Sequence, residues 1–170
     1  MEEQKESKII AFIKEYIPYV ITIILVILIK RYVVSPIRVH GDSMKNTLLD
    51  GDIMILNIIG KQFSDIKRFD IVVVDRGEEY IIKRVIGLPG EKIEYKDNQL
   101  YVNDKKVKDN HSTEVTNDFV IEVPKDSYFV LGDNRTNSLD SRYFGAFKKN
   151  QILGKTKLTL FPFNRIGNKK

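Results

Sequence analysis

Residues 41–48, Gly-Asp-Ser-Met-Lys-Asn-Thr-Leu, put a single serine, Ser43, in a short polar turn between two apolar runs. A serine that follows a glycine turn can present its hydroxyl to a substrate, and nearby backbone N–H groups can stabilise a developing oxyanion. Serine in a Gly- and Asp-rich turn is most often ordinary turn chemistry. A catalytic interpretation therefore needs a base elsewhere in the chain that accepts the serine proton.

Histidine is the commonest partner of a catalytic serine, and the chain has two. His40 lies three residues before Ser43 on a segment that we predict to be extended, and no orienting carboxylate is evident near it. His111 lies in the most polar stretch of the chain. Both histidines are interpreted as surface residues.

Lysine is the other base known to activate serine. Lys83 lies in the middle of the apolar run 80–86 and, by two-residue alternation, shares a strand face with Ile81 and Val85. Such a lysine is either exposed on an edge strand or buried, and burial would lower its pKa and suggest a functional role. The strand alone leaves both readings open.

A third cluster, residues 132–145, contains two Arg, two Asp, two Asn and two Ser between glycines. This density exceeds what a hairpin turn needs. It fits a hydrogen-bond network that orients a base, and it also fits a rigid structural loop with Asp–Arg pairs. The two interpretations do not exclude each other.

Short β-prone runs separated by turns dominate the chain after residue 35. Eight runs are predicted as strands: 53–56, 69–74, 80–86, 92–95, 99–102, 119–123, 128–131 and 156–161. Residues 93–104 read as a hairpin with Asp97-Asn98 at its turn, Asn103-Asp104 marks a second turn, and 105–118 reads as a surface loop. The pattern predicts an all-β domain of antiparallel sheets, of barrel or sandwich type.

An apolar segment precedes this domain, with an uncharged run over 16–29 and an earlier apolar stretch from residue 9. From residue 9 the segment is long enough to span a bilayer as a helix. The alternatives are a cleaved signal peptide, for which no small-x-small site follows, and a buried core helix, which would be amphipathic. We predict a short N-terminal segment (1–15), one transmembrane anchor (16–34, with a start near residue 9 also compatible) and a catalytic domain (35–170) with a variable insertion near 92–128.

The composition of the chain excludes several classes of function. The 170 residues carry a net charge of +5 and include no cysteine, which rules out disulfide and thiolate chemistry. The basic residues are interspersed with acidic ones and form no nucleic-acid-binding pattern, so we read them as solvated surface that suits anionic lipid. We find no phosphate-binding loop, dinucleotide fingerprint or metal-ligand cluster, and expect no cofactor, metal or nucleic-acid partner.

Together these segments resemble the bacterial type I signal peptidases, membrane-anchored Ser-Lys proteases that remove signal peptides from secreted precursors. Four blocks match in order: 41–48, the strand 68–74, the segment 83–90 (Lys-Arg-Val-Ile-Gly-Leu-Pro-Gly) and the cluster 132–145. The last two are long and specific. The single anchor and the small domain look like the Gram-positive form.

The resemblance implies a role for each matching residue. It implies that Ser43 is the nucleophile, that its backbone N–H is an oxyanion donor, and that Lys83 is the general base. It makes Ser138 the residue that hydrogen-bonds and orients the lysine. Asp140 and Arg142 match a supporting pair. Shallow substrate pockets fall at Val39, Met44, Leu48 and Ile82.

Two positions depart from the family pattern. Asn46 stands where the family often has proline. Gly41 stands where some members supply a second oxyanion donor from a serine hydroxyl, which glycine lacks. A backbone N–H or water must then serve as the second donor. These departures affect the fine geometry of the turn and leave Ser43 and Lys83 as the implied catalytic pair.

The resemblance implies acyl transfer on precursors that carry signal peptides, by a single-pass cell-membrane enzyme. Its N-terminus is expected in the cytoplasm and its catalytic domain on the extracytoplasmic face, although the flanking positive charges are even and do not themselves set the orientation. Two rivals remain: a self-cleaving repressor-type Ser-Lys peptidase, which would carry a DNA-binding domain, and a non-catalytic, membrane-tethered β-domain, in which Lys83 would be exposed and far from Ser43.

Overall fold

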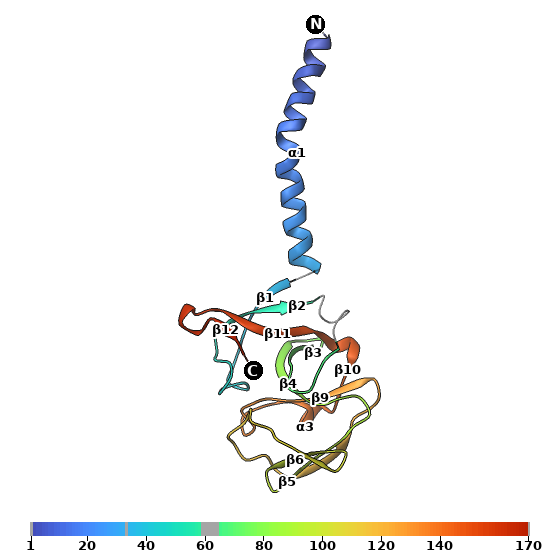
Figure 1. The fold of residues 1–170 in the computed structure, drawn as a ribbon, viewed down its shortest axis with the longest axis vertical. Helices are drawn as coiled ribbons and strands as arrows, with labels where there is room; N and C mark the ends of the chain where they lie inside the picture. Colours follow the sequence, from blue (N-terminus) through green and yellow to red (C-terminus); the bar gives the residue numbers. More distant parts are fainter. Residues whose placement is uncertain (1, 33, 59–64, 170) are drawn as a thin grey trace. The chain divides into compact units, whose positions relative to one another are not determined.

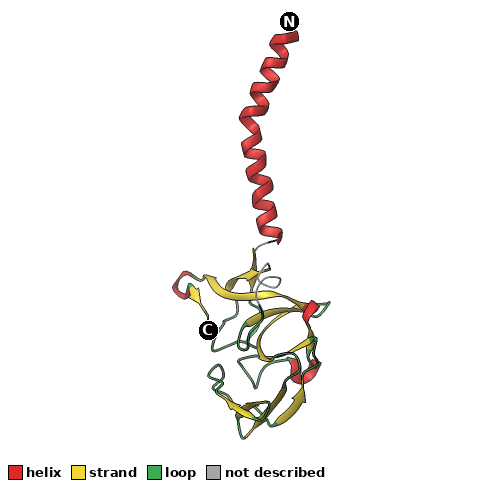
Figure 2. Ribbon diagram, turned by 45° about the vertical axis from the view of Figure 1, so that its right-hand side comes forward, coloured by secondary structure: helices red, strands yellow, loops and turns green. Residues whose placement is uncertain are grey.

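The protein, seen here as a computed structural model, is described over residues 2–32, 34–58 and 65–169. It divides into two compact units, Met1–Val34 and Ser35–Lys170. Each unit is described by itself below, and Figures 1 and 2 show the elements of both.

The first unit is a single helix, α1 (Glu2–Tyr32). Its segment Phe12–Ile29 is long and apolar enough to cross a membrane, and none of that segment is buried. Pro18 lies inside the helix, and Thr22 Oγ1 donates a hydrogen bond to the Pro18 carbonyl at 2.8 Å. The apolar N-terminal helix predicted from the sequence is confirmed. Because none of residues 12–29 is buried, the segment does not have the environment of a core helix.

The second unit is built mainly on an eight-stranded antiparallel sheet. Its strand order is β1-β2-β11-β3-β4-β9-β10, with β12 paired to β11. The strands are β1 (Val34–Arg38), β2 (Ile53–Asn57), β3 (Ile71–Asp75), β4 (Tyr80–Gly87), β9 (Ser127–Leu131), β10 (Phe147–Lys148), β11 (Ile152–Phe161) and β12 (Gly167–Asn168). The order places β3 and β4 in the interior of the sheet, where both of their edges are paired.

A smaller sheet of order β7-β6-β5-β8 forms the second layer of this unit. Its strands are β5 (Lys92–Lys96), β6 (Gln99–Val102), β7 (Lys105–Val107) and β8 (Phe119–Glu122). Asp97 and Asn98 join β5 to β6 with φ of 50° and 58°, and Asn103 and Asp104 join β6 to β7 with φ of 49° and 63°. Positive φ at both central residues matches the tight hairpin turns predicted there.

Short helical turns connect the remaining strands: α3 (Ser141–Phe144), η1 (Lys149–Gln151) and η2 (Phe163–Arg165). All eight predicted strand runs are strands, and the all-β prediction is confirmed. The prediction that 105–118 is a surface loop is partly wrong. The segment begins with β7, and Thr116 is only 2% exposed.

Three apolar clusters hold the β unit together. Val85, Val130 and Ile152 belong to the first, which lies in the main sheet. Ile93, Leu100 and Phe129 belong to the second, which joins the small sheet to β9. The third packs beneath the serine turn and consists of Val39, Met44, Leu48, Met54 and Ile71. β-Branched side chains dominate these strands because they pack well on a pleated surface.

Candidate active site

The structure brings Ser43 and Lys83 together although forty positions separate them in the chain. Lys83 Nζ lies 2.6 Å from Ser43 Oγ, which is hydrogen-bond distance. Ser43 lies in the turn between β1 and β2, and Lys83 lies within β4. A serine hydroxyl in direct contact with an amine is the arrangement that serine activation by lysine requires.

The pairing of β4 shows whether Lys83 lies on an exposed edge strand or is buried, which the sequence left open. β4 lies between β3 and β9, and Lys83 stands opposite Val72 of β3, so it does not lie on an edge strand. The lysine is 3% exposed. Burial lowers its pKa to about 8, although Asp140 and Glu79 act in the opposite direction. Lys83 is therefore mostly protonated at pH 7, but about one tenth of it is neutral there and can accept a proton, far more than for an ordinary lysine.

The serine turn has two residues with left-handed backbone. Gly41 has φ of 78°, and its N–H donates to Asp50 Oδ1 at 2.8 Å. Asn46 has φ of 90°, a conformation that proline cannot adopt because its ring fixes φ near −65°. Asparagine tolerates positive φ better than most residues. The asparagine at this position therefore fits the backbone of this particular turn.

Residues 132–145, which we call the catalytic loop, hold the serine turn from one side. The backbone N–H of Asn134 donates to the Ser43 carbonyl at 3.0 Å, and its side-chain amide donates to the Asp42 carbonyl at 3.0 Å. The Thr47 hydroxyl donates to Asp133 Oδ2. Three hydrogen bonds thus fix the turn on both sides of the serine.

Arg84, which follows Lys83, holds the catalytic loop to β4. Its Nε and Nη2 donate to the two carboxylate oxygens of Asp133 at 2.8 and 2.6 Å, and both side chains are fully buried. Its Nη1 donates to the Phe69 carbonyl at 2.9 Å and its Nη2 to Thr47 Oγ1 at 3.1 Å. The bidentate geometry suits arginine and carboxylate, and it fixes the loop relative to the strand that bears the lysine.

The three predicted orienting residues lie in the catalytic loop. Arg142 donates to both carboxylate oxygens of Asp140 at 2.9 Å, and Asp140 Oδ2 accepts the Gly132 N–H at 3.0 Å. Ser138 is 8% exposed, and its Oγ has no hydrogen-bond partner among the described residues. The expected bond from Ser138 to Lys83 is therefore not formed in this structure.

Gly132 explains how closely the loop approaches the serine. A Cβ at this position would lie 2.2 Å from Ser138 Oγ and 2.4 Å from the Ser43 carbonyl oxygen, so only glycine fits. The Gly132 backbone therefore touches both Ser43 and Ser138. Its position sets how these two residues lie relative to each other.

A groove of about 740 Å³ runs along β1 and β4. Its lining includes Ile37, His40, Leu56 and Ile82. Ile82 immediately precedes Lys83, so the groove reaches the strand that carries the candidate base. Of the four predicted pocket residues only Ile82 lines it. Val39, Met44 and Leu48 are at most 2% exposed and belong to the core cluster beneath the serine turn.

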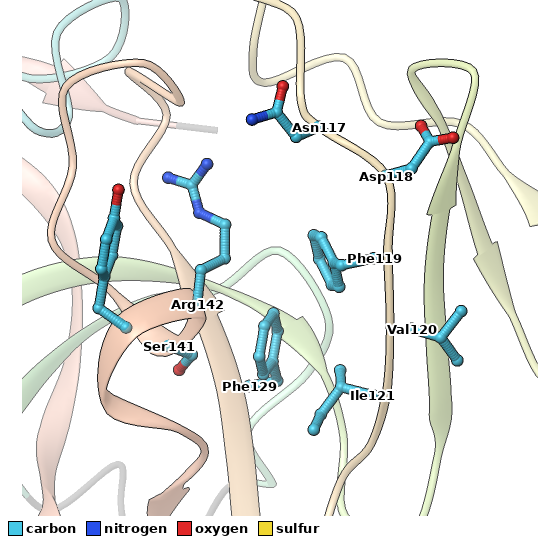
Figure 3. Close-up of a pocket in the computed structure, with 9 residues that line it drawn as sticks. Asn117, Asp118, Phe119, Val120, Ile121, Phe129, Ser141 and Arg142 are labelled. Atoms are coloured by element: carbon cyan, nitrogen blue, oxygen red, sulfur yellow. The ribbon is translucent and has the colours of Figure 1, made fainter.

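A second pocket of about 340 Å³ lies between β8 and α3 (Figure 3). Phe119 and Phe129 form its apolar wall, and the Arg142 guanidinium extends toward Asn117. The same guanidinium holds Asp140, so this pocket borders the catalytic loop on the side of the small sheet.

The two histidines lie in different surroundings. His40 is exposed, as expected, and Lys83 occupies the place of the base. His111 is only partly exposed: its ring stacks on Phe69 with centroids 4.6 Å apart, and its Nδ1 lies 3.1 Å from Asp109 Oδ1.

Sequence reasoning missed the roles of Arg84, Asn134 and Arg135. For Arg84 the signal was available, because two consecutive charges in an apolar strand cannot both face solvent. Asn134 and Arg135 act through contacts distant in sequence, and the composition of the catalytic loop does not specify those partners.

Comparison with known proteins identifies the family of this chain. The family described as "Signal peptidase, peptidase S26" matches residues 12–161. The chain is 40% identical over 182 residues to Signal peptidase I of Bacillus amyloliquefaciens, covering 99% of this chain and 98% of that protein. It is 43% identical over 185 residues to Signal peptidase I P of Bacillus subtilis subsp. natto, with the same coverage.

More distant similarity extends to staphylococci and enterococci. Signal peptidase IB of Staphylococcus aureus is 34% identical over 179 residues, covering 90% of this chain and 93% of that protein. The crystal structure of a signal peptidase I from Enterococcus faecalis matches with a TM-score of 0.50 and 36% identity, over 54% of this chain and 97% of that one. The chain therefore belongs to the signal peptidase family, peptidase S26, a family of serine endopeptidases.

Proposed function

We propose that this protein is a membrane-bound endopeptidase that cleaves signal peptides from secreted precursors through a Ser43–Lys83 dyad. The observation that carries the proposal is the 2.6 Å contact between Ser43 Oγ and the amine of a buried lysine. Family membership supports the substrate class.

The proposed reaction is acyl transfer in two stages. Neutral Lys83 accepts the Ser43 proton while Oγ attacks the scissile carbonyl, and the tetrahedral intermediate collapses to an ester as the C–N bond breaks. The Lys83 ammonium gives its proton to the leaving amine, which departs as the new N-terminus of the mature protein. Lys83, neutral again, accepts a proton from water as the water oxygen attacks the ester carbonyl. The second tetrahedral intermediate collapses with cleavage of the bond to Ser43 Oγ, the Lys83 ammonium returns its proton to that oxygen, and the signal peptide leaves as a carboxylic acid that ionises in water.

The oxyanion formed in both stages needs fixed donors. We assign one to the backbone N–H of Ser43, because the turn around it is held by Asn134 on one side and by Asp50 on the other. Gly41 supplies no side-chain donor, so a backbone N–H or water completes the site. We assign Ser138, Asp140 and Arg142 to positioning Lys83. Asp140 is the charge whose electrostatic effect on the Lys83 pKa is largest.

The groove along β1 and β4 is the proposed binding site for an extended segment of the precursor. Ile37, Leu56 and Ile82 give it an apolar lining suited to short aliphatic side chains. Val39, Met44 and Leu48 support the groove from below through the core. This arrangement agrees with small residues at the cleavage site of signal peptides.

We propose that α1 anchors the enzyme as a single membrane span, with the N-terminus in the cytoplasm and the β unit on the extracytoplasmic face. A tethered enzyme and a tethered precursor share one surface, which raises their effective concentration without any added contact. Protease protection on sealed membranes tests the orientation. Digestion of the β unit only from the cytoplasmic side would contradict it.

The hairpin of β11 and β12 supports contact of the β unit with lipid. Phe161, Phe163 and Ile166 are 46, 78 and 55% exposed, and the two aromatic rings pack edge to face with centroids 5.5 Å apart. Arg165 donates to both Asp52 carboxylate oxygens and, at 3.3 Å, to the Thr47 carbonyl. We propose that these apolar side chains enter the bilayer interface, where aromatic residues are favoured.

Cleavage of a radiolabelled precursor by the full chain in proteoliposomes tests the function. The wild type is expected to release the mature protein with the native N-terminus, and Ser43→Ala and Lys83→Ala are expected to reduce the rate to background. Cleavage by either variant at the wild-type rate would disprove the proposed dyad.

A further inference from the structure

The small sheet contacts the catalytic loop through a buried polar cluster. We call residues 92–122 the insert. Its connection from β7 to β8 carries Asp109, whose side chain is 8% exposed, and the facing side chain of the catalytic loop, Arg135, is 1% exposed. A solvated appendage could be attached without burying charged side chains, so this buried ion pair between the insert and the catalytic loop needs another explanation.

Asp109 is surrounded by donors. Arg135 Nη2 donates to its Oδ2 at 2.5 Å, the Tyr95 hydroxyl donates to the same oxygen at 2.6 Å, and the His111 backbone N–H donates to Oδ1 at 3.0 Å. Arg135 Nη1 donates in turn to the Tyr95 hydroxyl at 2.7 Å and to Thr116 Oγ1 at 3.0 Å. Every one of these partners of Arg135 belongs to the insert.

The charge state of Asp109 agrees with this geometry. Burial by itself would raise the pKa of Asp109, but the hydrogen bond from His111, the charge of Arg135 and the Tyr95 hydroxyl outweigh burial and hold that pKa well below its usual range. Asp109 therefore stays ionised and compensates the buried guanidinium of Arg135.

Arg135, which Asp109 holds in place, also contacts the backbone of Gly132. Its Nε donates to the Gly132 carbonyl at 3.0 Å, while the Gly132 N–H is held by Asp140. The Gly132 backbone packs directly against the Ser43 carbonyl and Ser138 Oγ. An unbroken series of contacts therefore leads from Asp109 through Arg135 and Gly132 to the nucleophile.

A second series of contacts starts from the same cluster. The His111 ring stacks on Phe69, whose carbonyl accepts a hydrogen bond from Arg84. Phe69 has φ of 71°, a strained conformation for a bulky residue that the surrounding contacts must hold in place. Arg84 holds Asp133 of the catalytic loop. The insert thus supports that loop at Arg135 and at Asp133.

We propose that Asp109 is a positioning residue for the reaction, acting through Arg135 and Gly132 to hold Ser43 and Ser138 in place. The inference rests on the proposed Ser43–Lys83 function. Asp109 lies in the insert and outside the groove, so its loss disturbs the reacting groups and leaves binding of the peptide intact. Misplacement of reacting groups by about 1 Å lowers turnover on the order of 100-fold.

Steady-state cleavage of an internally quenched signal-peptide substrate by the full chain tests this. Asp109→Asn is expected to lower kcat by about 10- to 100-fold, with KM within about twofold of the wild-type value. Asp104→Asn is the matched control, because Asp104 forms an exposed ion pair with Lys92 in the same insert. That variant is expected to keep both constants.

A second control separates positioning from loss of folded protein. Val102→Ala removes methyl groups from the core of the insert and leaves the Asp109 cluster in place. Rates are normalised to the folded fraction from thermal unfolding. Val102→Ala is expected to lower the melting temperature while keeping kcat per folded molecule. If Asp109→Asn does not fold, Tyr95→Phe, which removes one hydroxyl from the cluster, is expected to lower kcat with KM unchanged.

The outcomes distinguish this inference from the proposed function. The positioning role is overturned if Asp109→Asn has the same kcat per folded molecule as Val102→Ala. Tyr95→Phe is compared in the same way if Asp109→Asn does not fold. A variant that changes only KM also overturns the positioning role. Full activity of Ser43→Ala would instead overturn the dyad itself. Wild-type cleavage, an inactive Ser43→Ala and a wild-type kcat for Asp109→Asn would leave the function standing and remove only the inference.

Discussion

Arg84 and Asp133 form a fully buried bidentate ion pair one residue away from Lys83 in the chain. The pair connects the strand that supplies the candidate base to the loop that holds the candidate nucleophile. The two candidate side chains, Ser43 and Lys83, lie 2.6 Å apart where the strand and the loop are joined.

Breaking this pair is expected to destabilise the β unit strongly. Arg84→Met leaves the Asp133 carboxylate buried without its charge partner, and such losses cost about 3–5 kcal/mol. Chemical unfolding in detergent, followed by near-ultraviolet circular dichroism of the tyrosines, measures the change. Lys92→Met breaks an exposed pair and is expected to leave the midpoint unchanged. Equal midpoints for the two variants would contradict the structural role of Arg84.

The pH dependence of cleavage is expected to follow the ionisation of Lys83. Only the neutral amine accepts the serine proton, and burial lowers the pKa of Lys83 to about 8. The value of kcat/KM should therefore rise about tenfold per pH unit below that pKa and level off above it. A profile that is flat across this range, with a substrate that does not titrate there, would exclude Lys83 as the base.

The same burial predicts that Lys83 weakens the fold. Its pKa falls from 10.5 to about 8 on folding, so below pH 8 both states are protonated and the folded state bears the full cost of the buried charge. That cost is about 3 kcal/mol at about 1.4 kcal/mol per pKa unit. Between pH 8 and 10.5 the folded state loses its proton first, and the cost shrinks.

Lys83→Met is accordingly expected to be inactive and more stable than the wild type at pH 7, by up to about 3 kcal/mol. The advantage should vanish as the pH approaches that of the unfolded lysine. Unfolding curves of the two proteins across this pH range measure it. A variant less stable than the wild type at neutral pH would mean that the lysine is not desolvated in the way described here.

Lipid contact by the β11–β12 hairpin can be measured with a single tryptophan, because the chain contains none. Phe163→Trp in proteoliposomes is expected to be quenched by brominated lipids, since Phe163 is 78% exposed on the proposed membrane-facing hairpin. Val115→Trp, at a position 66% exposed in the insert, is the control and should stay unquenched. Equal quenching of the two tryptophans would remove the lipid assignment.

The sequence sufficed where local pattern decides the structure. The eight strand runs alternate or are β-branched, and Asp97-Asn98 and Asn103-Asp104 specify their turns directly. The burial of Lys83 could not be read from its strand, because burial depends on the pairing of β4 with β3 and β9, which is decided by distant residues. The position of Lys83 in an apolar strand singles it out among the lysines, and the family resemblance implies its role as a base.

The polar contacts around the site were less predictable for the same reason. Asp109 and Arg135 lie in segments that look like solvated loops, and each becomes buried only when the insert packs on the catalytic loop. Ser138 lies against Gly132 as the close approach requires, yet its hydroxyl has no partner among the described residues. Whether such a hydrogen bond forms depends on shifts in atomic position of less than about an ångström, and a sequence motif does not specify positions that closely.

The central claim is that Ser43 attacks the scissile carbonyl with Lys83 as its base. The most direct test is an acid-quenched single turnover of the full chain on a precursor peptide, followed by mass spectrometry of the proteolytic fragment that contains Ser43. The account predicts an added mass on Ser43 equal to the acyl half of the substrate, present in the wild type and absent from Lys83→Met. Cleavage by a Ser43→Ala enzyme at the wild-type rate, which would proceed without any adduct on residue 43, would contradict the account.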